Sequence, residues 1–479
     1  MNLGEKKEEK ISKKEAFVKI APNFLIRTLG CKVNQYDSAV LRRELIKRGF
    51  LEFREDFGSS FEVRSRTKIK NKTGFKAELK PEPNFKSLEP DLIVVNTCTV
   101  TNKAISKDKH LIKELRKKFP SGRLVVMGCW PETDETAIKS FSDKEVIFWG
   151  TGKIEALADK LKEGFNLSGI FESNFLAATD RSRYFLKIGD GCNQFCSYCL
   201  IPFARGRLKS RKSSELIKEA KLALDNGYRE IILSGIHLGR YGENKNGQEI
   251  NLSALIKKFL EIKNLGKIRL SSIEIDEVSD ELIDLINKES KICRHLHISL
   301  QSGSDKILEA MRRPYDSKFF NKRIKVLRKK VPGIAITTDI IVGFPGEGEK
   351  EFKETYNFAK KVAFSKIHVF SYSEHKKTLA SKLKDKVNQQ DIKNRSKILR
   401  ELSSNLENSY QEFIFKKYKN KELSFVLIKN PKKGGKYRLL SEFSFEIELT
   451  KKDLEKALVK QGQRIEDLKA GQLVSLVIV

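Results

Sequence analysis

The apolar positions in the first third of the chain form short runs that alternate with helical patterns. Residues 24–29 (FLIRTL) and 91–97 (DLIVVNT) are mainly apolar, as buried parallel strands are. Between them, residues 36–49 (YDSAVLRRELIKRG) carry apolar side chains at helical spacing and end at a glycine. The further elements expected are a helix at 103–118 and strands at 123–128 and 145–150. The pattern predicts an open parallel α/β sheet domain over residues 22–160.

Three polar segments surround or interrupt this domain. Residues 1–21 form a charged leader, and residues 161–182 form a polar connector. Residues 50–90 are basic, weakly patterned and punctuated by Gly and Pro, so we interpret them as an inserted loop or a ragged hairpin.

A second alternation of strands and helices follows the connector. The strands expected lie at 184–188, 229–233, 267–272, 295–299, 334–340 and 366–370. Helical patterns lie between them, and six such units predict a partial (βα)6 barrel over residues 183–415. A long charged helix is expected at about 388–418. In residues 416–479 the pattern changes to four short strands, which predicts a small C-terminal β domain.

Composition and charge narrow the class of protein. The chain has 479 residues and lacks an apolar run of the roughly eighteen residues that a membrane helix needs. No apolar stretch follows the charged N-terminus, so we expect a cytoplasmic protein without a secretory signal or membrane partner. The formal net charge of +31 favours a polyanionic partner, and nucleic acid is the leading candidate. An anionic membrane surface and a general enrichment in lysine are the alternative explanations of the charge.

Three of the seven cysteines lie within eight positions of one another. Cys192, Cys196 and Cys199 follow a predicted strand with the spacing C-x3-C-x2-C. Thiolates are soft ligands that hold iron–sulfur clusters or zinc. Structural zinc needs four ligands, and the sequence near these cysteines offers no fourth. The triad therefore predicts a 4Fe–4S cluster with one iron open to another ligand, with zinc or packed thiols as alternatives.

Three other cysteines each follow a different predicted strand. Cys31, Cys98 and Cys129 come after the strands that begin near residues 24, 91 and 123. The carboxyl ends of parallel strands share one edge of a sheet, where ligands usually bind. We therefore expect the three thiols to converge on a second cluster. Cys293 lacks such a context and is expected to be a buried, incidental thiol.

Three segments resemble one enzyme family. They are TLGCKVNQYDS (28–38), VNTCTVTNKA (95–104) and DGCNQFCSYCLIPFARGR (190–207). Together they are similar to the radical S-adenosylmethionine (SAM) methylthiotransferases, most of all to the branch that acts on N6-threonylcarbamoyladenosine at position 37 of tRNA. The resemblance covers residues 24–415 and extends only loosely to the tail, where the family has a TRAM domain. The chain departs from the family in its 50–90 insertion and in the tryptophan that follows Cys129.

The resemblance implies cofactors, partners and a reaction. It implies two 4Fe–4S clusters, with Cys192, Cys196 and Cys199 on the radical SAM cluster and the other triad on an auxiliary cluster. One SAM supplies a methyl group to sulfur, and a second supplies the radical that removes hydrogen from C2 of adenine. Acid–base side chains cannot attack such a C–H bond, so cofactors carry the chemistry. The partners implied are the tRNA anticodon loop and an electron donor such as flavodoxin or ferredoxin.

Further residues are candidates for binding SAM or RNA. Six SAM candidates lie at or near the ends of predicted barrel strands: Ser234, Gly235, Glu274, Ser299, Gln301 and Asp339. The seventh, Arg313, lies in MRRPY (311–315), which resembles the family's arginine-containing segment near SAM. The RNA candidates lie in or just beyond the C-x3-C-x2-C segment: Phe203, Arg205, Arg207 and Arg211. Turns, capping, solvated faces and packing around the cluster are the structural alternatives for these residues.

Three alternatives to the threonylcarbamoyladenosine branch remain open. The isopentenyladenosine and ribosomal-protein methylthiotransferases share the layout of the two triads. A noncatalytic iron–sulfur protein that binds RNA would also explain the cysteines and the positive charge.

Overall fold

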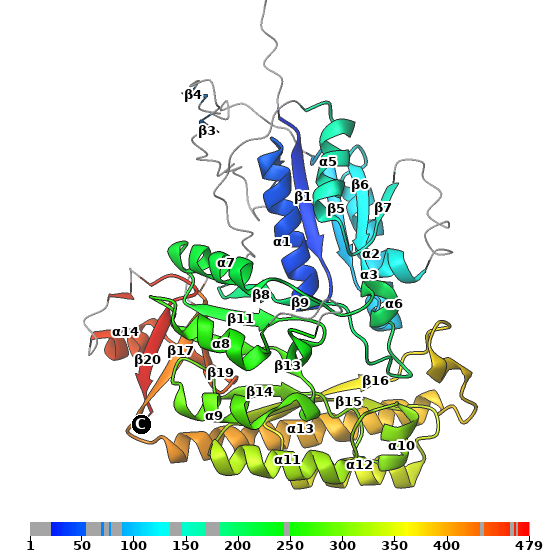
Figure 1. The fold of residues 1–479 in the computed structure, drawn as a ribbon, viewed down its shortest axis with the longest axis vertical. Coiled ribbons are helices and arrows are strands. Elements are labelled where there is room, and N and C mark those ends of the chain that lie inside the picture. Colours follow the sequence, from blue (N-terminus) through cyan, green and yellow to red (C-terminus); the bar gives the residue numbers. More distant parts are fainter. Residues whose placement is uncertain are drawn as a thin grey trace, which may run out of the picture.

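The computed structural model describes residues 21–53, 69–70, 76–77, 89–134, 146–167, 182–243, 250–431, 435–459, 464–465 and 468–478. The expected leader, most of the 50–90 insertion and much of the connector lie outside these residues. Three bodies follow one another along the chain: a parallel sheet, a partial barrel and an antiparallel sheet (Figure 1). Within the described residues, no helix combines the length and apolar character needed to cross a bilayer.

The first body is the open parallel sheet that the sequence predicts. Its strands lie in the order β2-β1-β5-β6-β7, all parallel. They span Leu51–Glu52 (β2), Asn23–Thr28 (β1), Leu92–Thr97 (β5), Arg123–Gly128 (β6) and Val146–Trp149 (β7). The helices are α1 (Lys32–Lys47), α2 (Asn102–Lys118), the short α3 (Cys129–Thr133) and α5 (Ile154–Gly164). In the 50–90 segment, β3 (Ile69–Lys70) pairs antiparallel with β4 (Lys76–Ala77).

Helices cover both faces of this sheet because its strands are apolar on both sides. Leu41 of α1 and Leu157 of α5 pack in one hydrophobic cluster with Val94. Ile112 of α2 packs in another cluster with Val95, the next residue of the same strand. Successive strand side chains point to opposite faces, so α1 and α5 cover one face and α2 the other.

The second body contains all six predicted barrel strands. They are β8 (Tyr184–Lys187), β11 (Glu230–Ser234), β12 (Lys267–Leu270), β14 (His295–Ile298), β15 (Ala335–Val342) and β16 (Lys366–Ser371). The strand expected at 267–272 is divided at Ser271: β12 pairs with β11, whereas β13 (Ser272–Ile273) pairs with β14. A parallel bridge between Ile268 and Ile292 joins the two halves. The barrel is therefore partial, with β8 and β16 as its edges.

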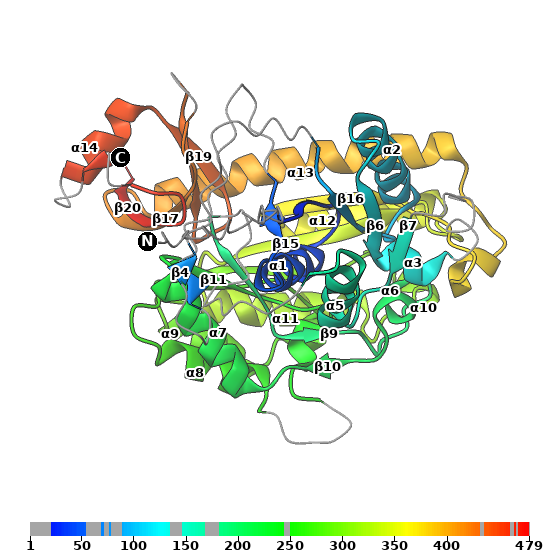
Figure 2. The ribbon, with the colours of Figure 1, turned by 90° about the horizontal axis from the view of Figure 1, so that it is seen from above.

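Helices enclose the outside of the barrel. They are α7 (Ser213–Asp225), α8 (Leu252–Leu260), α9 (Asp280–Lys288), α10 (Asp305–Ala310), α11 (Ser317–Lys330), α12 (Glu349–Val362) and α13 (Gln389–Lys417). The largest hydrophobic cluster of the protein forms between these helices and the strands. Seen from above, α1 of the first body lies over the barrel, so the two bodies are stacked (Figures 1 and 2).

The third body is an antiparallel sheet in the order β19-β18-β17-β20. Its strands are β17 (Glu422–Lys429), β18 (Tyr437–Ser441), β19 (Glu446–Leu449) and β20 (Leu473–Val477), and all four were predicted. Helix α14 (Lys451–Val459), between β19 and β20, was not predicted from the sequence. Leu454 and Leu458 of this helix pack in the core of the sheet.

Buried charges join the third body to the barrel. The guanidinium of Arg269 on β12 donates to the carboxylate of Glu230 at 2.8 Å and to the carbonyl of Ser441 at 3.0 Å. Lys267 Nζ lies 2.9 Å from Glu442 Oε2. The C-terminal sheet is thus held to β12, the barrel strand that ends just before Ser271.

Replacing Arg269 should loosen this junction. We expect Arg269→Ala to cost about 3 kcal/mol of unfolding free energy, since it weakens a buried charge pair and frees a buried carbonyl. Limited proteolysis should then release the C-terminal sheet faster than from the unchanged protein. The exposed pair of Lys257 and Glu281 provides the control, because Lys257→Ala should change stability by less than about 1 kcal/mol. Equal proteolysis of the Arg269 and Lys257 variants would contradict this account of the junction.

Candidate active site

The structure brings Cys31, Cys98 and Cys129 to the carboxyl edge of the first sheet. Cys31 directly precedes α1, Cys98 follows β5, and Cys129 begins α3 directly after β6. Because β1, β5 and β6 are adjacent and parallel, residues far apart in sequence meet there. The side chain of Asn34 contacts two of the three thiols. Its Oδ1 lies 3.4 Å from Cys31 Sγ and 3.9 Å from Cys129 Sγ.

Two glycines permit the close approach of these loops. Gly128 has a φ of +101°, and a Cβ there would lie 2.3 Å from Asn96 Oδ1 and 2.7 Å from the carbonyl of Thr97. Gly30 has a φ of +110°, and a Cβ there would lie 3.1 Å from the Cβ of Cys98. Glycine is the residue that adopts such conformations without steric cost. The glycine before each of Cys31 and Cys129 is therefore part of the site.

Burial favours the thiol form of Cys98 and Cys129. It raises the pKa of Cys98 to about 11 and that of Cys129 to about 12. The nearby Cys31 raises both values further, whereas Arg205 opposes the rise at Cys129. Thiolates are the metal-binding form, so iron would have to displace these protons.

The second triad lies on the loop between β9 (Gly189–Asp190) and α6 (Ile201–Arg205). Gly191 turns the chain with a φ of +71°, and a Cβ there would lie 2.1 Å from the carbonyl of Arg207. The backbone N–H of Cys192 donates to the carbonyl of Gly206 at 3.1 Å. The N–H of Cys199 donates to the carbonyl of Cys196 at 3.0 Å. These bonds close the loop, so its three cysteines lie on one short turn.

Cationic side chains contact this second triad. Arg313 Nη1 lies 3.1 Å from Cys196 Sγ, and Arg313 also forms an ion pair with Glu274. His237 Nδ1 lies 3.4 Å from Cys192 Sγ. Burial lowers the pKa of His237, but its hydrogen bonds to Cys192 and Glu277 outweigh burial and raise it to about 10. Burial raises the pKa of Cys196, and Arg313 opposes this rise because its positive charge favours the thiolate.

The position of His237 corrects one step of the sequence argument. The sequence places no histidine near the second triad, yet His237 contacts Cys192 because β11 lies beside β8. Even so, the described residues contain no group of three or more Cys, His, Asp or Glu side chains arranged around a single metal ion. In a 4Fe–4S cluster, each cysteine binds a different iron, so its sulfurs stay further apart than around one ion. Three thiols can hold such a cluster and leave its fourth iron open to a non-protein ligand.

Four of the expected SAM residues lie at the ends of barrel strands, whereas Asp339 lies within β15 and Arg313 follows α10. Ser234 ends β11, Gly235 follows it, and Glu274 and Ser299 follow β13 and β14. Gln301 has a φ of +71° and donates its N–H to the carbonyl of Asp339 at 2.8 Å. The side chain of Asp339 lies 3.1 Å from His297 Nε2.

The expected RNA residues divide into two groups. Phe203 is 49% exposed, and Arg207 stacks at 4.6 Å on the ring of Phe195 beside it. Arg211 instead pairs with Glu219 at 2.7 Å and donates to the hydroxyl of Tyr36 at 2.8 Å. The side chain of Arg205 has no exposed surface. Phe203 and Arg207 thus lie at the surface, whereas Arg205 and Arg211 are held by internal partners.

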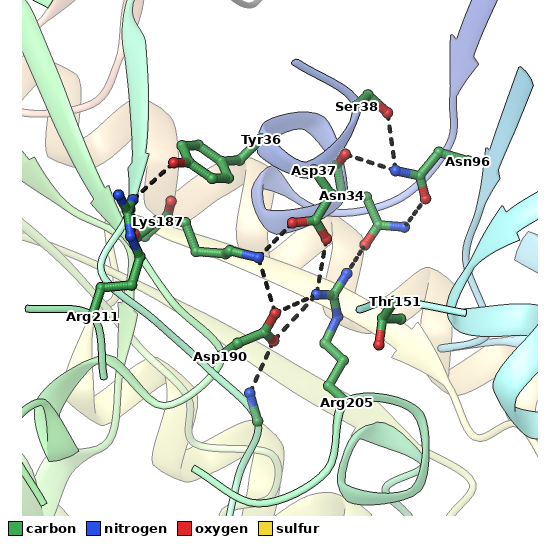
Figure 3. A network of polar contacts seen from close by, with 12 residues as sticks. Asn34, Tyr36, Asp37, Ser38, Asn96, Thr151, Lys187, Asp190, Arg205 and Arg211 are labelled. Carbon is green, nitrogen blue, oxygen red and sulfur yellow. Dashed lines mark hydrogen bonds and ion pairs between the residues drawn. The ribbon is translucent and has the colours of Figure 1, made fainter. Parts of the chain in front are cut away.

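Arg205 belongs to a buried network between α1 and the elements on either side of the second triad (Figure 3). We call it the Arg205 clamp; its members are Asn34, Asp37, Lys187, Asp190 and Arg205. The guanidinium lies 3.1 Å from Asp37 Oδ2 and 3.0 Å from Asp190 Oδ2, and it donates to Asn34 Oδ1 at 2.7 Å. Lys187 Nζ bridges the same two carboxylates.

The clamp connects elements of both bodies. Asn34 and Asp37 lie on α1, whereas Lys187, Asp190 and Arg205 lie on β8, β9 and α6. Two cations face two carboxylates, so the buried charges balance. Asn34 contacts the first triad, and Arg205 lies in the helix just after the second. Nothing in the sequence identified this network, although its acidic and amide residues lie within the two motifs TLGCKVNQYDS and DGCNQFCSYC.

Iron content tests the assignment of the cysteines. Anaerobic reconstitution should give about eight irons per chain, from two 4Fe–4S clusters. Cys98→Ala and Cys192→Ala should each lower this to about four, since each removes a ligand of only one cluster. Cys293→Ala is the matched control, because Cys293 is buried away from both triads and should leave the count unchanged. A full complement of iron in either triad variant would contradict the assignment.

Breaking the clamp should destabilise the protein. Asp37→Asn removes a carboxylate from between Lys187 and Arg205, and it should cost about 3 kcal/mol or more of unfolding free energy. Glu401→Gln, in the exposed pair with Lys397, should change it by less than about 1 kcal/mol. Denaturant titration measures both values. A similar small effect of the two substitutions would show that the clamp does not hold the bodies together.

Comparison with known proteins agrees with this geometry. Residues 186–359 match the family model of the radical SAM superfamily, and residues 77–150 match that of the uncharacterized protein family UPF0004. The solved structure of the radical SAM methyltransferase TsrM from Kitasatospora setae, which carries cobalamin and a [4Fe-4S] cluster, shares the fold with a TM-score of 0.53. It is 14% identical, and the match covers 76% of this chain and 77% of that one.

Curated relatives match most of the chain. The threonylcarbamoyladenosine tRNA methylthiotransferase MtaB of Bacillus subtilis is 36% identical over 83% of this chain and 83% of its own length. MtaB of Aquifex aeolicus is 33% identical, over 88% of this chain and 95% of that protein. The tRNA-2-methylthio-N(6)-dimethylallyladenosine synthase of Endomicrobium trichonymphae is also 33% identical, over 83% and 90%. With one thiol triad at the carboxyl edge of the first sheet, a second on the loop after β9, and relatives of this kind over most of its length, the chain belongs to the radical SAM methylthiotransferase family.

Proposed function

We propose that this enzyme transfers a methylthio group to C2 of N6-threonylcarbamoyladenosine at position 37 of tRNA. The observation that carries the proposal is the pair of thiol triads joined through the Arg205 clamp. One triad alone is consistent with many radical reactions, whereas a second triad, on the first sheet, provides a separate place for sulfur. The printed names of the relatives from Bacillus subtilis and Aquifex aeolicus supply the substrate class.

The proposed roles of the chain's own residues follow from where they lie. Cys31, Cys98 and Cys129 would hold the auxiliary cluster, and Cys192, Cys196 and Cys199 the radical SAM cluster. Bound in this way, the clusters and SAM supply methylthio sulfur and a radical that removes the C2 hydrogen. The protein residues orient these groups, balance their charge and keep the two sites at a fixed separation.

Residues on the rim of the barrel are proposed to bind SAM. The candidates are Ser234, Gly235, Glu274, Ser299, Gln301, Arg313 and Asp339. Glu274 and Arg313 form an ion pair beside Cys196, so a ligand that binds there meets both a carboxylate and a guanidinium. SAM carries both an ammonium and a carboxylate, and such a pair offers partners for each.

The remaining parts of the proposal concern organisation and partners. We infer domains at 22–160, 183–415 and 416–479, with Phe203 and Arg207 meeting the anticodon loop. Flavodoxin or ferredoxin is the proposed electron donor, and the cytoplasm, where tRNA is modified, the proposed location. The net charge of +31 supports binding to tRNA that weakens as salt rises.

Nucleoside mass spectrometry tests this function directly. The reconstituted protein, given SAM and a reductant, should convert tRNA that carries N6-threonylcarbamoyladenosine into its 2-methylthio form. Cys192→Ala should abolish both SAM cleavage and product, because the radical SAM cluster loses a ligand, while tRNA binding persists. A protein that binds tRNA but never cleaves SAM would instead be a noncatalytic iron–sulfur protein.

Dimethylallyladenosine tRNA is the second candidate substrate. It is favoured by the relative from Endomicrobium trichonymphae, whose name specifies that base. The same assay with tRNA that carries N6-dimethylallyladenosine separates the two candidates. Product from this tRNA alone would reject the threonylcarbamoyl assignment.

A further inference from the structure

A cavity of about 770 Å³ opens beside the first thiol triad. Gly30 and Cys98 line it from the first sheet, and Phe370 lines it from β16 of the barrel. Helices α2 and α13 supply further walls, and Figure 2 shows these two helices close to β16. Its volume lies in the range of small-molecule sites, so it is large enough for a modified nucleoside. The cavity therefore adjoins the proposed source of sulfur at the open edge of the barrel.

The walls of this cavity carry an excess of positive charge. Four cations line it, namely Lys103, Lys107, Lys386 and Arg400, against the single carboxylate of Glu374. Lys386 is paired with Glu374 at 2.7 Å. In the part of the chain that the structure describes, the other three cations have no ion-pair partner. Three unpaired cations around one cavity favour an anionic occupant.

The placement of these cations suits a small anion. Lys103 and Lys107 lie four residues apart and so share one face of α2, in its first two turns. The N-terminus of a helix carries a partial positive charge, which adds to theirs. Arg400 enters from α13, on another wall of the cavity, and its planar guanidinium can bind a carboxylate through two parallel hydrogen bonds. An anion between the two helices would meet cations on both sides.

We propose that this cavity binds the carboxylate of the N6-threonylcarbamoyl group and so selects the substrate base. The inference rests on the proposed function and adds the residues that recognise the substituent. A threonylcarbamoyl group ends in a carboxylate, whereas a dimethylallyl group is a neutral hydrocarbon that leaves the three cations unpaired. Phe370, 40% exposed, offers a ring on which an unstacked base can rest. Lys103, Lys107 and Arg400 are thus specificity residues for the anionic modification.

Binding measurements with three synthetic anticodon stem–loops test this proposal. The RNAs differ only at position 37, which is N6-threonylcarbamoyladenosine, N6-dimethylallyladenosine or adenosine. Fluorescence anisotropy with the reconstituted protein, without SAM and at one fixed salt concentration, measures affinity without turnover. The unchanged protein should bind the threonylcarbamoyl RNA about tenfold more tightly than the adenosine RNA, the effect of one or two hydrogen bonds to a charged group.

The variants should remove this preference without removing RNA binding. Arg400→Gln and the double substitution Lys103→Gln with Lys107→Gln should each bring the affinity ratio close to one. Arg400→Lys should keep part of it, since it keeps the charge and loses the planar fork. Lys113→Gln is the matched control, because Lys113 is exposed on the same helix but does not line the cavity. Iron content of each variant confirms that the protein is intact.

Two results would overturn the proposal. If the variants weaken all three RNAs equally, the cations bind backbone phosphates instead of the base substituent. If the preference for the threonylcarbamoyl RNA survives in every variant, recognition lies elsewhere. Either result is compatible with formation of the 2-methylthio product by the unchanged protein. The nucleoside assay therefore tests the proposed function independently of this proposal.

Discussion

The arrangement of this protein depends on one buried guanidinium. Arg205 follows the second cysteine triad in the chain, yet its side chain contacts Asp37 and Asn34 of the first body. Removing such a group from water costs several kcal/mol, and the cost is offset only when every charge around it is paired. Asp37, Asp190 and Lys187 provide that balance. An exposed arginine would tolerate small movements of the two bodies, whereas a buried one holds them in a single relative position.

The relative position of the two bodies matters because each triad is formed in a different way. The first uses the topology of a parallel sheet, which brings Cys31, Cys98 and Cys129 to one edge from positions nearly a hundred residues apart. The second uses a local turn that is closed by backbone hydrogen bonds around Gly191. Neither construction determines where the other triad lies. Arg205 contacts Asn34, and Asn34 contacts two of the thiols of the first triad. These contacts determine how the two triads lie relative to each other.

Sequence patterns predicted most of the fold because buried strands are locally recognisable. All four strands expected in the first sheet, all six in the barrel and all four in the tail are present. The division of the third barrel strand at Ser271 was missed, since pairing partners and not composition determine it. Helix α14 was missed because its apolar residues are few and its pattern is short.

The cysteines were recognisable from sequence, whereas their surroundings were not. A thiol at the end of a strand has a local signature, but Asp37 looks like any polar residue of an amphipathic helix. Arg205 and Arg211 resemble an RNA-binding patch in sequence, and only the fold shows that carboxylates and a tyrosine already hold them. Long-range charge pairing has no short sequence pattern, so buried ion networks escape this kind of prediction. We conclude that the clamp holds the two cluster sites at one fixed separation.

Pulsed electron paramagnetic resonance of the reduced, reconstituted protein tests that claim most directly. Two paramagnetic clusters held close together shorten each other's spin relaxation. If the clamp holds the clusters close together, the spin of the cluster on Cys192, Cys196 and Cys199 should relax faster in the unchanged protein than in Cys98→Ala, where the other cluster is absent. Arg205→Ala should show an intermediate or heterogeneous rate. The same relaxation rate in all three proteins would show that the clamp does not hold the two clusters close together.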